Sequence, residues 1–143
     1  MKPLEIAPIA EKLDEIQIIV QQTRSELEFY DFEVKFFYNL LDKHLLPLID
    51  KESVSRIKTT VDQLKTLEQQ KDAFKENFDQ FRQSLDETIY DSNLDNPKIN
   101  ELLQNMLVKK LELFKSFRRF KKVFFAVFEY LLHTEKANTL LYE

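Results

Sequence analysis

The stretch FRRFKKVFFAVFEY, residues 117–130, places six aromatic and four basic side chains within fourteen positions. At the 100° per residue of an α-helix, its phenylalanines fall on one arc, while Arg118, Arg119 and Lys122 fall on another. Only Lys121 lies within the apolar arc, where its aliphatic stem can pack along apolar surface. The stretch therefore predicts an amphipathic helix with a wide aromatic face.

The composition of the whole chain agrees with a helical fold. Its 143 residues include no glycine, no cysteine and only four prolines. A chain without glycine cannot easily form tight turns with positive φ or phosphate-binding loops. This excludes the glycine-rich nucleotide motifs and disfavours β-sandwich and α/β folds. The absence of cysteine excludes disulfides and thiolate chemistry, and fits a reducing compartment.

Three long segments without a helix breaker follow one another along the chain. We predict helices over about 9–46, 51–89 and 97–139. The first ends before Pro47, because a residue that precedes proline disfavours the helical region. At the start of the second helix, Asp50 is a suitable N-cap and Glu52 lies in the first turn. At the start of the third helix, Asn96 is a suitable N-cap and Pro97 occupies the first helical position.

Apolar residues recur at heptad spacing in each segment, which predicts one core stripe per helix. The first stripe contains Leu13, Ile16, Val20, Thr23, Leu27, Tyr30, Val34, Phe37, Leu41, His44 and Leu48. The second contains Ile57, Thr60, Leu64, Leu67, Lys71, Phe74, Phe78, Phe81, Leu85 and Thr88. The third contains Ile99, Leu103, Met106, Lys110, Leu113, Phe117, Phe120, Phe124, Val127 and Leu131.

These patterns predict an all-α fold: an elongated, antiparallel, up-down-up three-helix bundle with coiled-coil-like packing, in one domain over residues 1–143. Each helix would be roughly 55 Å long, and dimerisation could complete a larger bundle. Short connections make successive helices antiparallel, so the first and third helices are parallel. Lys71 and Lys110 occupy core positions, where polar residues usually specify register or oligomeric state.

The charges are distributed unevenly among the three segments. Residues 1–50 carry five basic and ten acidic side chains, whereas residues 98–143 carry nine and five. The predicted register places a basic cluster at the level of four carboxylates. The cluster consists of Lys115, Arg118, Arg119 and Lys122, and the carboxylates are those of Glu26, Glu28, Asp31 and Glu33. These charges could set helix pairing, or the cluster could bind an anionic partner such as lipid head groups.

A second apolar stripe lies on the far side of the first helix from its core stripe. It contains Ile18, Phe29, Phe32, Phe36 and Leu40. Three phenylalanines at i, i+3 and i+7 should not remain in water, because an exposed apolar patch of this kind promotes association. The first helix could be central in an irregular bundle, could form a homodimer seam, or could dock another protein or a lipid.

The sequence predicts a non-enzymatic interaction or scaffold protein, which self-associates as a dimer or binds a helical partner. Alternatives are binding to an anionic membrane surface through the third helix, and carriage of a small ligand in the aromatic core. No pattern predicts catalytic residues, a cofactor or a metal site, although His44, Glu129 and His133 could approach one another at one bundle end. The net charge of −4 disfavours nucleic acid. With neither a membrane-span pattern nor a signal-peptide pattern, we expect a cytoplasmic protein.

Overall fold

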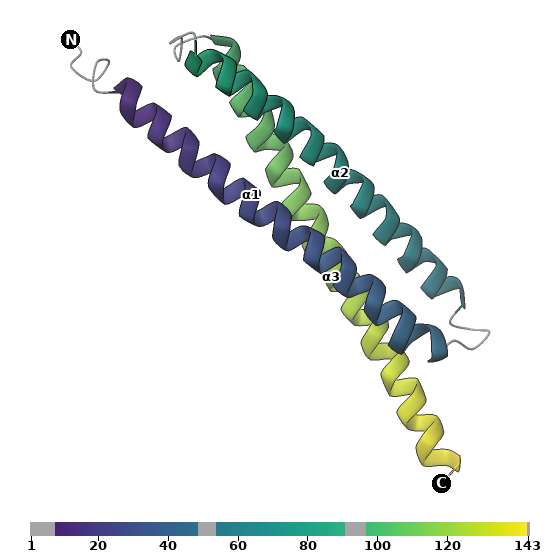
Figure 1. The fold of residues 1–143 in the computed structure, drawn as a ribbon. Coiled ribbons are helices and arrows are strands. Elements are labelled where there is room, and N and C mark those ends of the chain that lie inside the picture. Colours follow the sequence, from purple (N-terminus) through teal and green to yellow (C-terminus); the bar gives the residue numbers. More distant parts are fainter. Residues whose placement is uncertain (1–7, 49–53, 91–96, 143) are drawn as a thin grey trace. The chain divides into compact units, whose positions relative to one another are not determined.

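The computed structural model describes the backbone of residues 8–48, 54–90 and 97–142, and the side chains of residues 12–47, 54–90 and 97–133. Every residue in these backbone ranges is helical, and no strand occurs among them. The helices are α1 (Pro8–Leu40), α2 (Val54–Tyr90) and α3 (Pro97–Tyr142), as Figure 1 shows. The predicted all-α, up-down-up three-helix bundle is therefore confirmed. The capping roles of Asp50, Glu52 and Asn96 lie outside the described residues.

The chain divides into two compact units, and each helix contributes a segment to both. The first unit comprises residues 1–30 and 71–113, and the second comprises residues 31–70 and 114–143. In the second unit, Arg56 at the start of α2 stacks on Tyr130 of α3, whereas Leu67 lines a groove with Phe120. This order shows that α2 and α3 are antiparallel there. The single domain predicted from the sequence stays a prediction, so each unit is described by itself.

Nearly all the predicted heptad positions form the cores of the two units. The first unit buries Ile16, Thr23, Leu27, Tyr30, Lys71, Phe74, Phe78, Phe81, Leu85, Thr88, Ile99, Met106 and Leu113. The second unit buries Val34, Phe37, Leu41, Leu45, Ile57, Thr60, Leu64, Leu67, Phe117, Phe120, Phe124 and Leu131. Leu13, Val20, Leu103, Lys110 and Val127 are half-buried. The side chain of Leu48 lies outside the described residues.

Three threonines occupy core positions without leaving a hydroxyl unsatisfied. The hydroxyls of Thr23, Thr60 and Thr88 donate to the carbonyls four residues earlier, at 2.7, 2.8 and 2.8 Å. This back-bonding satisfies a buried polar group within its own helix. Threonine can therefore replace an apolar residue in the heptad pattern without a partner from another helix.

The end of the first helix differs from the prediction of a regular helix to residue 46. α1 ends at Leu40 and is followed by a π-helical turn, η2 (Leu41–Leu45), and a short 3₁₀ turn, η3 (Leu46–Leu48). The N–H of Leu46 donates to the carbonyl of Leu41, five residues earlier. Proline at 47 has no N–H to continue the α-helical ladder, and the π turn advances each residue by a smaller angle. As a result, the side chain of Leu45 is buried in the core. The side chain of His44 is exposed, so the prediction that His44 occupies a core position is wrong.

Candidate interaction surface

The second unit carries an exposed apolar surface formed by α1 and α3, which we call the aromatic face. Phe32 and Phe36 on α1 are 65% and 43% exposed, and Phe125 and Leu132 on α3 are 48% and 42% exposed. Leu40, which follows Phe36 by one turn, is half-buried. The predicted apolar stripe residues that lie in the second unit are therefore accessible to water. The exposed surface also includes residues of α3, which the predicted stripe did not contain.

The aromatic face is supported by the buried ring of Phe37. The ring centroid of Phe37 lies 5.8 Å from that of Phe36 on α1 and 6.2 Å from that of Phe125 on α3. Below them, Phe37 contacts Phe120 and Phe124 at 5.1 and 4.8 Å. Because Phe36 and Phe125 contact the same buried ring, the exposed aromatic residues of the two helices belong to one surface that rests on a packed core.

An ion pair joins α1 to α3 beside the aromatic face. The Nζ atom of Lys121 lies 2.6 Å from Oε2 of Glu33, whose side chain is only 10% exposed. The other carboxylate oxygen of Glu33, Oε1, is buried and has no hydrogen-bond partner among the described residues. Lys121 is the one lysine within the apolar arc of residues 117–130, and the structure assigns its ammonium group to this nearly buried carboxylate.

The first unit contains a similar but more exposed arrangement. Lys110 on α3 pairs with Glu26 on α1 at 3.4 Å, with side-chain exposures of 19% and 44%. Ile18 and Phe29 of the predicted stripe are 57% and 55% exposed, and Leu111 on α3 is 52% exposed. These three residues are called the first-unit apolar face below. Each unit therefore combines an α1–α3 ion pair with exposed apolar side chains on the same two helices.

The basic cluster of Lys115, Arg118, Arg119 and Lys122 is exposed on α3. None of its members forms an ion pair with another residue in the described ranges; Arg119 donates a 3.5 Å hydrogen bond to the hydroxyl of Ser116. Glu26 and Glu33, two of the carboxylates predicted at this level, pair with Lys110 and Lys121 instead. The four cations are therefore available to an external anionic group.

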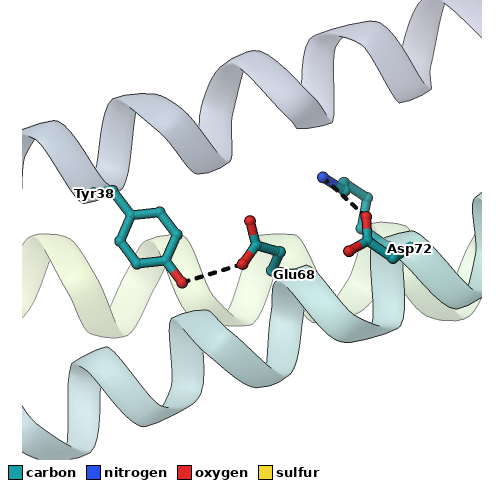
Figure 2. A network of polar contacts seen from close by, with 4 residues as sticks. Tyr38, Glu68 and Asp72 are labelled. Atoms are coloured by element: carbon teal, nitrogen blue, oxygen red, sulfur yellow. Dashed lines mark hydrogen bonds and ion pairs between the residues drawn. The ribbon is translucent and has the colours of Figure 1, made fainter.

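Two further polar contacts involve α2, one to α1 and one within α2 itself. The hydroxyl of Tyr38 on α1 donates to Oε1 of Glu68 on α2 at 3.3 Å, as Figure 2 shows. In the first unit, the buried Lys71 pairs with the exposed Asp72 at 3.3 Å. This contact lets the lysine stem fill a core position while its ammonium group reaches a carboxylate.

Each unit also has a surface groove whose lining includes no residue of the aromatic face. In the second unit, a groove of about 400 Å³ between α2 and α3 is lined by Gln63, Thr66, Leu67, Gln70, Ser116, Arg119, Phe120 and Val123. In the first unit, a groove of about 350 Å³ between α1 and α2 is lined by Gln17, Val20, Gln21, Arg82, Leu85, Asp86 and Ile89. Each groove contains a single arginine, and neither brings together an acid, a base and a nucleophile in the manner of a catalytic site.

The two histidines do not form the conceivable metal site at the bundle end. Nε2 of His133 lies 3.7 Å from Oε1 of Glu129, one turn earlier on α3, and both side chains are about three-quarters exposed. Within the described ranges, no group of three or more histidine, cysteine, aspartate or glutamate side chains could hold a metal ion. In the same ranges, no helix combines the length and the apolar character needed to cross a membrane.

The fold and the surface define an all-α, up-down-up helical bundle whose exposed phenylalanines lie on two of its three helices. No protein-family model matches the sequence, and no curated protein or solved structure is significantly similar to it. A function for this chain must therefore be argued from its own surface.

Proposed function

We propose that this chain is a non-enzymatic helical-bundle interaction protein, which acts by self-association or by docking a helical partner on the aromatic face. The observation that carries the proposal is that Phe32 and Phe36 are 65% and 43% exposed, whereas the ring of Phe37 that supports Phe36 is 1% exposed. Burial of each such side chain by a partner contributes up to about 1.5–3 kcal/mol. A rigid patch of aromatic side chains on a helical pair is a typical docking surface for an amphipathic helix.

The test compares two pairs of substitutions at exposed apolar residues. We expect Phe32→Gln with Phe36→Gln to abolish association in sedimentation velocity, while helicity and melting temperature remain close to those of the wild type. The control is Val54→Gln with Tyr90→Gln, because these residues are exposed on α2, a helix that contributes no residue to the aromatic face. Unchanged association of the Phe32/Phe36 variant would contradict the proposal, and so would its unfolding, which would show that these side chains serve the core.

A photo-crosslinking amino acid at position 32 extends the test to partners other than a second copy. We expect position 32 to crosslink to a protein, whereas the same group at position 54 does not. If position 32 gives no protein crosslink, the aromatic face is not a docking surface for a protein.

The basic cluster supports a second candidate function, binding to an anionic membrane surface. Its four cations have no ion-pair partner within the described ranges, and basic side chains beside exposed aromatic ones suit the interface of an anionic bilayer. Flotation with phosphatidylserine-containing vesicles tests this function. We expect binding to be lost in a variant with Lys115→Glu and Lys122→Glu, and absence of wild-type binding would exclude this candidate.

A further inference from the structure

The two units of the chain carry opposite net charges. In the first unit, residues 1–30 and 71–113, nine basic and fifteen acidic side chains give −6. In the second unit, residues 31–70 and 114–143, twelve basic and ten acidic side chains give +2. Each unit is therefore electrostatically complementary to the other unit of a second copy.

The charges also lie next to the exposed apolar residues. In the first unit, the exposed Asp14 and Glu15 precede Ile18 by four and three residues, so they share its side of α1. In the second unit, the exposed Arg118 and Lys122 precede Phe125 by seven and three residues and share its side of α3. Acidic side chains therefore lie beside Ile18 of the first-unit apolar face, and basic side chains lie beside Phe125 of the aromatic face. The carboxylate of Glu129, four residues after Phe125, is paired with His133.

We infer that the aromatic face of one copy docks on the first-unit apolar face of a second copy, so that the chain forms a reciprocal homodimer. This inference rests on the proposed function and names its partner. In the dimer, Arg118 and Lys122 of each copy approach Asp14 and Glu15 of the other. The apolar residues of both faces leave water together, and the charged borders set the alignment.

The exposed apolar area agrees with a reciprocal contact. A large apolar side chain offers on the order of 200 Å², so the half-exposed residues of the aromatic face, together with Phe114 on α3, expose about 500 Å². The three residues of the first-unit apolar face add about 300 Å². Stable interfaces bury about 800 Å² per partner, which neither face supplies alone and both supply together.

A second copy fits these observations better than an anionic membrane does. A negatively charged surface would attract the second unit, which carries +2, and repel the first, which carries −6. It would also leave Ile18, Phe29 and Leu111 in water. A second copy covers both apolar faces and neutralises both charged borders.

Charge reversal and mixing test the inference. The first variant carries Arg118→Glu and Lys122→Glu, and the second carries Asp14→Lys and Glu15→Lys; all four positions are exposed. In sedimentation equilibrium at low salt, we expect each variant alone to dimerise about ten- to a hundredfold more weakly than the wild type. We expect an equimolar mixture of the two to dimerise more tightly than either alone, because the reversed borders then match. Circular dichroism confirms that both variants remain folded.

Other outcomes separate this inference from the proposed function. A wild-type chain that remains monomeric at high concentration, but crosslinks through position 32 to a different protein, would overturn the homodimer and leave the docking function intact. A dimer that tolerates both charge reversals, or a mixture that shows no rescue, would overturn the acidic-to-basic alignment. A dimer that survives Phe32→Gln with Phe36→Gln would overturn the aromatic face itself, and with it the proposed function.

Discussion

Replacement of Lys121 by methionine should destabilise the second unit through Glu33. The lysine stem is retained in methionine, but the ammonium group 2.6 Å from Oε2 of Glu33 is lost. The carboxylate of Glu33 would then lose this cation, although the side chain is only 10% exposed to water. Its other oxygen, Oε1, already has no hydrogen-bond partner within the described residues. Removal of one partner from a fully buried ion pair costs about 3–5 kcal/mol.

The geometry of this pair places the expected cost below that range. The side chain of Lys121 is 37% exposed, so water reaches the position of the lost ammonium group and partly solvates the remaining charge. We therefore expect the free energy of unfolding to fall by about 2–3 kcal/mol. For a chain of this size, that change lowers the melting temperature by roughly 4–12 °C. Thermal melts followed by far-ultraviolet circular dichroism measure it.

A matched pair in the first unit provides the control. Lys110→Met removes a lysine from the same kind of α1–α3 ion pair, but its partner Glu26 is 44% exposed and can be hydrated. We expect this change to cost no more than about 1 kcal/mol. Addition of Glu33→Leu to Lys121→Met should restore most of the lost stability, since no charge is then left buried. The reasoning would be refuted if Lys121→Met melted no lower than Lys110→Met, or if the double variant melted lower than the single one.

Two further predictions concern the cores. Phe37→Ala should lower the free energy of unfolding by about 3–5 kcal/mol, because this side chain is 1% exposed and contacts four aromatic rings. Phe32→Ala, at a 65% exposed position, should change it by no more than about 0.5 kcal/mol. Denaturant titrations measure both effects, and equal effects would contradict the separation of core from surface. Lys71→Leu should raise the melting temperature, because leucine suits a core position and the carboxylate left behind on Asp72 is 64% exposed and stays hydrated. A marked decrease would show that the ammonium group of Lys71 is required.

The cores could be predicted from the sequence because heptad spacing directly encodes which side of a helix is buried. Lys71 shows the strength of this signal: it was placed in the core by spacing alone, and it is 6% exposed. The relative level of α1 and α3 was also predictable, since Glu26 and Glu33 pair with residues 84 and 88 positions later, close to the expected register. Helix length and direction determine this level without knowledge of the side chains.

The end of α1 and the extent of the aromatic face could not be predicted in the same way. The π turn at Leu41–Leu45 reflects a local competition among backbone hydrogen bonds before Pro47, and spacing carries no record of its outcome. Phe125 and Leu132 lie at the edge of a wide apolar arc, and the sequence does not specify how much of that arc the neighbouring helices cover. The sequence did offer one signal of the α1–α3 contact beside this face, the position of Lys121 within the apolar arc, because a cation among apolar residues is stabilised by a nearby carboxylate.

The distribution of phenylalanine among the helices supports the proposal that a partner covers the exposed ones. Of thirteen phenylalanines, the three on α2, at positions 74, 78 and 81, are all buried, whereas five on α1 and α3 are exposed. The exposed aromatic residue of α2 is a tyrosine, Tyr90, at the last position of that helix. The exposed phenylalanines lie on α1 and α3, and in the second unit Phe36 and Phe125 contact the same buried ring. Apolar side chains that rest on a packed core in this way are typical of a surface that a second protein covers.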